Sequence, residues 1–148
     1  MTVKELSRDD IDLIRESYLQ LSADLQRAGD VFYEKLFELA PETRHLFLQD
    51  MTAQAAKLMS TLGLVVSQLQ NTEELEPVIR DLALRHLAYG VEPQHYGLVR
   101  EALIRMLKTL LSEPTTSEVF DAWARAYDRL AGVMLAAAYP ENAHRAAR

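Results

Sequence analysis

His86 is the side chain whose type and position in this sequence most directly suggest chemistry. The apolar residues before it recur every three or four positions, as one stripe of a helix does: Leu75, Val78, Ile79 and Leu82. His86 falls on the same stripe, and an unpaired polar group that faces an apolar interior costs about 1–3 kcal/mol. Its imidazole therefore needs either a structural hydrogen bond or a metal, because neutral imidazole is the commonest metal ligand in proteins. The residue alone favours the hydrogen bond, and the rest of the sequence favours the metal.

Composition excludes several classes of protein. The chain has 148 residues, of which 49% are hydrophobic, so it can bury one core as one domain, residues 1–148. It has no cysteine, which excludes disulfides, iron–sulfur clusters and thiolate ligands and fits a cytoplasmic location. The net charge is -6 without a basic cluster, so we expect no nucleic-acid or lipid partner. Met1–Ser7 does not read as a signal peptide, and apolar runs such as 134–138 are too short to span a membrane.

The elements that must position His86 are all expected to be helices. Glycine and proline are sparse and separate long segments of helical periodicity, whereas strand alternation is absent. The first expected helix begins near Ser7, the second runs from about Asp24 to Leu39, and a third begins at Pro41. The fourth runs from about Thr52 to Gln70, and the fifth runs from a cap at Asn71–Glu74 to Gly90. The sixth begins at Pro93, and the last runs from Pro114–Glu118 to a stop at Pro140. Residues from about 140 form a polar tail. We therefore predict an all-α fold of seven or so helices that cross steeply around a pocket.

Three segments resemble bacterial globins in the correct order and spacing. The segment Phe32–Phe47 looks like their B-to-C region. The segment Arg85–Val91, followed by Tyr96, resembles their F-to-G corner, and a tryptophan and a tyrosine, Trp123 and Tyr127, resemble the start of their last helix. Along its whole length the chain is similar to single-domain bacterial haemoglobins and to the globin half of flavohaemoglobins. This resemblance implies a globin fold and haem b, iron protoporphyrin IX, as cofactor.

The resemblance also implies roles in the haem pocket. His86 matches the proximal iron ligand, and Phe47 matches the aromatic residue that packs flat on the porphyrin. Tyr33 matches the distal tyrosine of the B helix, with a structural hydrogen bond to backbone as the alternative. Gln54 matches the distal residue of the E helix, with a solvated surface position as the alternative. Leu58, four residues later, faces the same side and would set steric access.

Four further residues complete the implied pocket. Lys57 and Arg85 flank it and either pair with the haem propionates or remain solvated. Val91 belongs to the segment that resembles the F-to-G corner, and the resemblance therefore places it in the implied pocket. Tyr96 matches a tyrosine that joins a glutamate in binding the proximal histidine of flavohaemoglobins, but Ala138 stands where that glutamate belongs. This departure weakens the case for a strongly basic proximal ligand and peroxidase-like chemistry.

The distal residues suit a polar diatomic ligand. Dioxygen bound at a haem carries partial negative charge, so a nearby O–H or N–H donor stabilises it more than carbon monoxide. A hydrogen bond to a charged acceptor contributes about 1.5–3 kcal/mol, which is roughly ten- to a hundredfold in affinity. Tyr33 and Gln54 together therefore predict a site that releases oxygen slowly.

The sequence leaves three functions open. The first is reversible binding of dioxygen, nitric oxide or carbon monoxide at a pentacoordinate haem iron, for oxygen transport, storage or scavenging. The second is enzymatic: nitric oxide dioxygenation, which would serve nitric oxide detoxification. This reaction needs a separate reductase, because we find no flavin or nicotinamide site in the sequence and expect no reductase domain. The third is a globin-fold sensor or interaction module without haem, against which His86 argues. No catalytic residue is assigned, and the oligomeric state stays open.

Overall fold

Helices make up all the regular structure in the computed structural model, which describes residues 6–47, 50–112 and 116–140. In chain order they are α1 (Arg8–Leu21), the 3₁₀ segment η1 (Ser22–Asp24), α2 (Leu25–Leu39), the 3₁₀ segment η2 (Pro41–Leu46), α3 (Met51–Ser67), α4 (Thr72–Ala88), α5 (Pro93–Leu110) and α6 (Ser117–Ala138). The predicted all-α class is confirmed. The predicted polar tail and Pro114 lie outside the described residues. No helix of the described part is long and apolar enough to cross a membrane.

Acidic and hydroxyl side chains start the first three α-helices. Ser7 and Asp10 form the predicted capping box of α1, in which Ser7 Oγ accepts from the Asp10 backbone N–H at 3.0 Å. Asp24 accepts from the backbone of α2, and Asp50 caps α3 in the same way. The predicted cap at Asn71 is wrong in one respect, because the Asn71 side chain makes no capping hydrogen bond to α4.

The end of α4 explains why a glycine follows His86 so closely. Gly90 has φ of 94°, a left-handed conformation that other residues rarely adopt. This turn lets the Val91 N–H donate to the His86 carbonyl and the Gly90 N–H donate to the Leu87 carbonyl, each at 3.1 Å. The pattern is a Schellman motif, which satisfies carbonyls that the helix end would leave unpaired. His86 thus lies in the last turn of α4, where the turn fixes the backbone.

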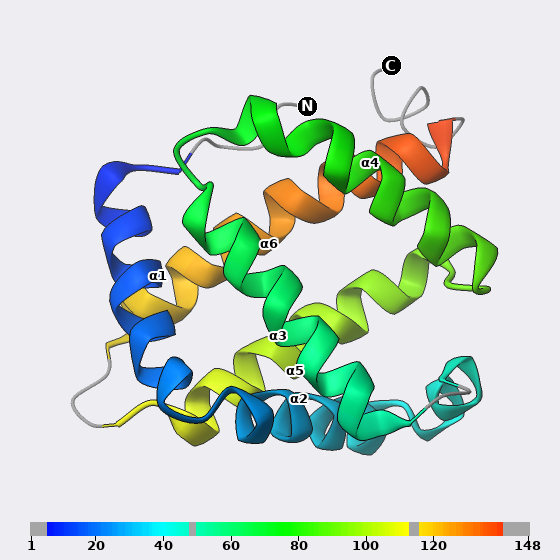
Figure 1. The fold of residues 1–148 in the computed structure, drawn as a ribbon, viewed down its shortest axis with the longest axis horizontal. Coiled ribbons are helices and arrows are strands. Elements are labelled where there is room, and N and C mark those ends of the chain that lie inside the picture. Colours follow the sequence, from blue (N-terminus) through cyan, green and yellow to red (C-terminus); the bar gives the residue numbers. More distant parts are fainter. Residues whose placement is uncertain (1–5, 48–49, 113–115, 141–148) are drawn as a thin grey trace.

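The helices leave a gap between two neighbours in the chain. α2 packs on α3 and α5, α1 packs on α3 and α6, and α4 packs on α6 (Figure 1). α3 and α4 are joined by only a few residues, yet they do not pack along each other. The buried side of α4 carries Leu75, Ile79 and Ala83. Val78, predicted on this stripe, is 46% exposed, because it lies about 100° around the helix from Ile79.

Gly29 allows α2 and α3 to cross closely. A Cβ atom added at Gly29 would lie 2.6 Å from the carbonyl oxygen of Ala55, closer than carbon and oxygen tolerate. Tyr33 follows Gly29 by one turn and Gln54 directly precedes Ala55, so this close crossing brings the two polar side chains together. The backbone contact is therefore what places the predicted distal pair.

Two polar contacts, one partly buried and one fully buried, join α1 to α6. Arg125 donates to both carboxylate oxygens of Asp10 at 2.7 and 3.1 Å, and the Trp123 indole donates to Ser17 Oγ at 2.8 Å. The hydrogen bond from Arg125 is the main reason that the pKa of Asp10 lies below its ordinary value of 3.8. Both contacts fix the N-terminal helix against the last one.

We predict that Asp10→Asn lowers the free energy of unfolding by about 1–2 kcal/mol at pH 7, the effect of a charged hydrogen bond reduced by solvent screening. Because the folded-state pKa is lowered, the stabilisation is present above about pH 4 and is lost as the pH falls through the folded-state pKa. Urea unfolding between pH 2 and 7 measures both effects. Asp128→Asn is the control, since Asp128 is 46% exposed where it pairs with Arg100 and should contribute less than 1 kcal/mol. Equal losses in the two variants would contradict the prediction.

Candidate functional site

The His86 imidazole is fixed through one of its two nitrogens. Nδ1 lies 2.8 Å from the carbonyl oxygen of Leu82, one turn earlier on α4. A carbonyl only accepts, so Nδ1 carries the proton and Nε2 keeps its lone pair. The partner that the sequence demanded is thus a backbone oxygen, and this same hydrogen bond leaves the other nitrogen able to bind a metal. The two alternatives for His86 are compatible.

The surroundings of His86 keep its imidazole neutral. Burial is the largest influence and lowers the pKa of His86 below its ordinary value of 6.5, while the bond to Leu82 opposes this shift. The positive charges of Arg85 and Lys57 lower the pKa of His86 further. Neutral imidazole is the form that binds metals, so the site is set for ligation near neutral pH.

A second polar group lies on α2 and α3. The Tyr33 side chain is buried, and Gln54 Nε2 donates to the Tyr33 hydroxyl oxygen at 3.2 Å. Gln54 is only partly exposed, and within the described residues the Tyr33 hydroxyl bonds to a side chain rather than to backbone. Burial raises the pKa of Tyr33 above 10, so the hydroxyl stays protonated and its own hydrogen remains available to a further acceptor.

Aromatic rings surround the Tyr33 side chain. The Phe47 ring meets Tyr33 edge-on with 5.1 Å between centroids, and Phe37 lies 5.7 Å from Phe47. Phe47 is partly buried at the end of η2. Leu58, one turn after Gln54 on α3, packs partly buried against the same core. The hydroxyl of Tyr33 therefore lies among apolar groups, where hydrogen bonds are stronger than in water.

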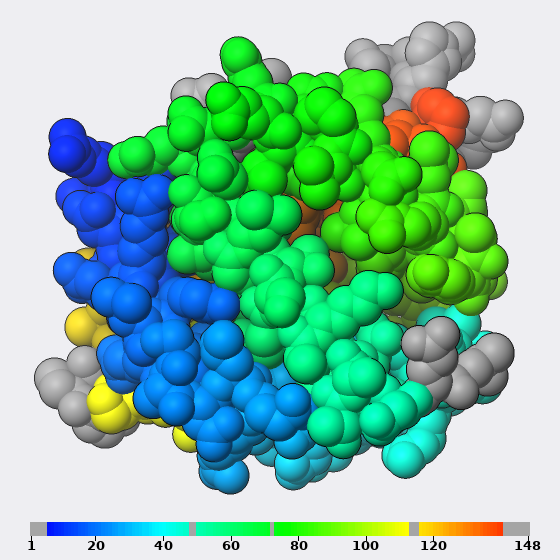
Figure 2. All heavy atoms as spheres, in the orientation of Figure 1, coloured from blue at the N-terminus to red at the C-terminus, as the bar shows by residue number. Residues whose placement is uncertain are grey.

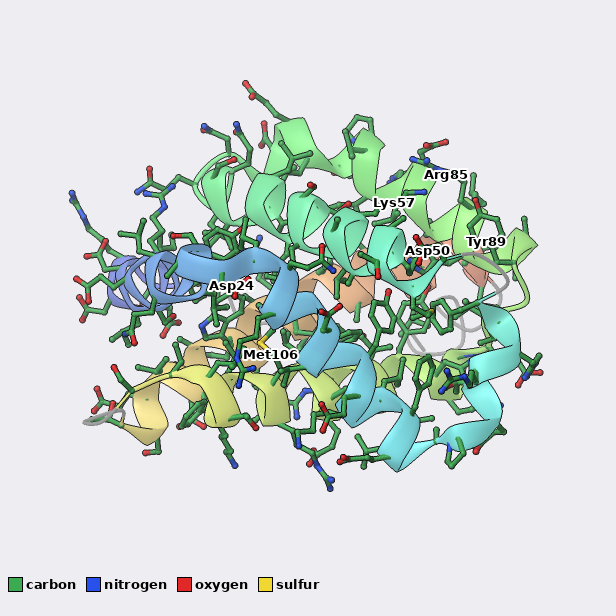
Figure 3. The ribbon with its side chains drawn as sticks, turned by 60° about the horizontal axis from the view of Figure 1, so that its bottom comes forward. Asp24, Asp50, Lys57, Arg85, Tyr89 and Met106 are labelled. Atoms are coloured by element: carbon green, nitrogen blue, oxygen red, sulfur yellow. The ribbon has the colours of Figure 1, made fainter. Side chains whose placement is uncertain are left out.

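The helices that carry the distal pair and the proximal histidine border a hollow, or crevice. Figure 2 shows this hollow between α3 and α4, with α6 visible at its base. Lys57, three residues after Gln54, is exposed but close enough to His86 to influence its charge. Figure 3 shows Lys57 of α3 near Arg85 of α4, and Arg85 pairs with Asp81 at 2.7 Å. The start of α3 thus lies over the part of α4 that carries His86.

Tyrosines of α6 and its C-terminal cap hold the proximal corner. The Tyr139 hydroxyl donates to the Val91 carbonyl at 2.5 Å, and the Tyr127 hydroxyl donates to the Tyr96 carbonyl at 2.7 Å. Val91 in turn bonds to the His86 carbonyl. Sequence reasoning missed Tyr139, because it follows the last helical turn and no periodicity marks it. Ala138 is buried in the same apolar cluster as Tyr96, so position 138 brings an apolar side chain, not a carboxylate, to this cluster.

The other described histidines are engaged elsewhere. His45 is exposed, and its Nδ1 contacts the carbonyl of Glu42. His95 Nδ1 accepts from the Glu92 N–H at 2.9 Å, and this hydrogen bond caps α5. His144 lies outside the described residues.

The donor set suits a metal that arrives with its own ligands. Within the described ranges no group of three or more histidine, cysteine, aspartate or glutamate side chains could hold a metal ion. A bare ion needs about four ligands, whereas a metal in a macrocycle needs only one or two from the protein. One neutral imidazole facing an apolar hollow fits a haem.

Comparison with known proteins agrees with this site. The sequence profile of the globin family matches residues 30–134, and the chain belongs to this family. Globin relatives imply a haem cofactor. The chain is 31% identical to a neuroglobin of Tetraodon nigroviridis, over 84% of this chain and 87% of that protein. It is 32% identical to a flavohemoprotein of Rhizobium meliloti, over 70% of this chain but only 26% of the relative's length.

Solved structures give the same fold. An engineered carbene transferase from Rhodothermus marinus, whose parent carries the provisional name nitric oxide dioxygenase, superposes with a TM-score of 0.82 at 33% identity. The superposition covers 95% of this chain and 99% of that one. A bacterial globin from Campylobacter jejuni has a TM-score of 0.79 at 21% identity, over 93% of this chain and 99% of that one, which supports the fold.

We predict that His86 titrates below pH 6.5, the ordinary histidine pKa, in the haem-free protein. Folding should then become less favourable as the pH falls below about 6.5, because the unfolded chain binds the proton more readily. Lys57→Gln should raise the pKa of His86, since it removes a like charge. NMR titration of the imidazole measures this, with Arg80→Gln as control because Arg80 is paired with Glu76 at 2.6 Å and lies six residues before His86. A His86 pKa at or above 6.5 would refute the conclusion that burial and the neighbouring charges keep the imidazole neutral.

Proposed function

We propose that this protein binds haem b through His86 and reversibly binds dioxygen in the crevice between α3 and α4. The observation that supports the proposal is the presence of polar groups on the helices at both sides of the crevice. His86 would offer Nε2 from α4, and the Tyr33 hydroxyl, which receives a hydrogen bond from Gln54, would face it from α2. When bound, the haem would supply an iron centre that takes a diatomic gas.

The remaining predicted residues have positions that support this use. Phe47 would pack on the porphyrin beside Tyr33, and Leu58 would narrow access from the same face as Gln54. Lys57 and Arg85 are exposed at the edge of the crevice, where the propionates of a haem would need cations. The other two predicted residues, Val91 and Tyr96, accept the hydroxyl hydrogen bonds of Tyr139 and Tyr127 and would keep the proximal corner in place.

The distal hydrogen bonds form a chain with a direction. Gln54 donates to Tyr33, which leaves the Tyr33 proton for dioxygen, and successive hydrogen bonds polarise each other. Tyr33 would therefore contact the ligand directly, while Gln54 orients the hydroxyl and strengthens it. The contributions of the two residues would then depend on each other.

Visible spectra of the purified protein test the proposal. We expect a Soret band, a five-coordinate ferrous form, and a ferric form that is five-coordinate or water-ligated near neutral pH. A second histidine ligand is not expected, because His45 is exposed and engaged with Glu42. His86→Ala should give a folded helical protein with little haem. Full haem retention with an unchanged Soret band, or a low-spin bis-histidine spectrum, would overturn the proposal.

We predict that Tyr33→Phe speeds oxygen release roughly ten- to a hundredfold, from the 1.5–3 kcal/mol of a hydrogen bond to a charged acceptor. Association and carbon monoxide release should change less, since most affinity changes appear in the off-rate. Stopped-flow displacement of oxygen by carbon monoxide measures the rates.

Gln54→Leu separates the two distal roles. If Gln54 acts through Tyr33, its loss should speed release less than the loss of Tyr33, and the double variant should match Tyr33→Phe. Additive effects would mean that both residues contact the ligand. An off-rate of Tyr33→Phe within about twofold of the wild type, or about 0.4 kcal/mol, would mean that Tyr33 is structural.

Nitric oxide dioxygenation is the second candidate, favoured by the flavohemoprotein relatives and by the name of the Rhodothermus protein. In that reaction dioxygen, nitric oxide and one electron combine into nitrate, and the electron would come from a separate reductase. Nitrate formation that continues over many turnovers when a reductase is supplied would establish it. The cytoplasm, where such reductants are available, is the proposed location.

A further inference from the structure

The outer face of α4 carries an apolar stripe that is open to solvent. α4 runs along the upper edge of the molecule in Figure 1 and packs on α6. Leu84 is 53% exposed and Leu87 is 42% exposed. Pro77 and Ala88 are exposed on the same side, because residues three, four or seven apart share one face of a helix. Leu84 lies nine residues after the buried Leu75, which places it about 180° around the helix, directly opposite the core.

Charged side chains border this stripe, and their signs balance. Arg80 pairs with Glu76 at 2.6 Å, and Arg85 pairs with Asp81 at 2.7 Å. These four are the acidic and basic residues of 76–88 apart from the histidine, so the outer face of α4 is neutral although the chain carries a net charge of -6. An exposed apolar patch with a polar rim is typical of a protein–protein contact. A second copy of this chain would meet no net repulsion on this face.

We infer that the protein forms a weak symmetric dimer through the outer face of α4, with the two copies of the helix antiparallel. A twofold axis joins identical surfaces, so the face must be complementary to itself. With the axis near position 83, Leu84 meets Leu84 of the second copy, and Pro77 meets Ala88 of the second copy. Asp81 and Arg85 lie two residues on either side of position 83, so each of them faces its opposite charge in the second copy.

The same register avoids contacts between like charges. Arg80 lies three residues before position 83 and Leu87 lies four residues after it, so the arginine stem packs beside the leucine of the second copy. Glu76 lies opposite Gly90, which has no side chain. The Arg85 guanidinium has five N–H donors, so its contact with the second copy leaves donors for a haem propionate.

The size of this contact predicts its strength. The stripe from Pro77 to Ala88 covers about 17 Å of helix at 1.5 Å per residue. One helix face per copy buries less than the roughly 1,200 Å² of lasting complexes, so we expect a Kd on the order of 100 µM. The exchanged ion pairs stay partly exposed and contribute little, so the two leucines provide most of the stabilisation.

The dimer leaves the haem crevice uncovered. His86 lies two residues after Leu84, about 160° around α4 and on the inner side of the helix. The inference therefore goes beyond the proposed function and does not depend on it.

Sedimentation velocity of the haem-loaded protein in its carbon monoxide form tests the inference. Between about 1 µM and about 1 mM we expect a change from monomer to mostly dimer. Leu84→Glu places two carboxylates together at the twofold axis and should weaken the dimer roughly tenfold or more. Leu19→Glu is the matched control, because Leu19 is 69% exposed on α1, and its Kd should stay within about twofold of the wild type. The Soret band should be unchanged in both variants.

Leu84→Cys tests the register. The chain has no cysteine, so oxidation can join only the introduced thiols. Beside a twofold axis two Cβ atoms can approach within the reach of a disulfide, so Leu84→Cys should form a covalent dimer much faster than Leu19→Cys.

Three results would overturn the inference. The first is a wild-type protein that stays monomeric at about 1 mM, well above the expected Kd, which would leave this face to a different protein. The second is a dimer that Leu84→Glu leaves intact or that Leu19→Glu weakens as much. The third is a Leu84→Cys variant that forms covalent dimers no faster than Leu19→Cys.

Discussion

The hydrogen bond between His86 Nδ1 and the Leu82 carbonyl constrains the whole proximal side. It selects the tautomer that leaves Nε2 unprotonated, and it holds the ring on the buried side of α4. This hydrogen bond holds the imidazole in one orientation only if the last turn of α4 is rigid. The Schellman turn at Gly90 secures that turn from within the helix, and Tyr139 secures it from α6 through Val91. One local hydrogen bond therefore depends on contacts from distant parts of the chain.

The distal side solves a different problem, which is to keep polar groups in an apolar place. Tyr33 is buried among aromatic rings, and in the described part of the chain its hydroxyl oxygen accepts from Gln54 alone. The pair exists because Gly29 lets α2 approach the backbone of α3 at Ala55. A side chain at Gly29 would separate the helices and with them the two polar groups. Helix packing thus sets the chemistry of the distal pocket as directly as the side chains do.

Local sequence was sufficient to predict most of the fold. Ser7, Asp24 and Pro41 mark helix starts, and Gly90 marks a helix end, because caps and turns involve residues within about four positions of each other. The position of His86 on a buried stripe followed from helical periodicity in the same way. The prediction for Val78 was wrong because the apolar pattern fitted locally but no neighbouring helix covers the side chain. The prediction for Asn71 was wrong because the residue precedes the helix but its side chain does not bond to the helix backbone.

By itself the sequence determined an all-helical chain, the buried face of α4, and the residue types available to a haem. The tertiary structure decided which of these residues meet. Gln54 reaches Tyr33 across 21 positions, Tyr139 reaches Val91 across 48, and Arg125 reaches Asp10 across 115. Such contacts depend on the angles at which helices cross, which are set by how whole surfaces of side chains interlock. Periodicity in one helix carries no information about that fit, so only the folded chain shows that Gln54 donates to Tyr33.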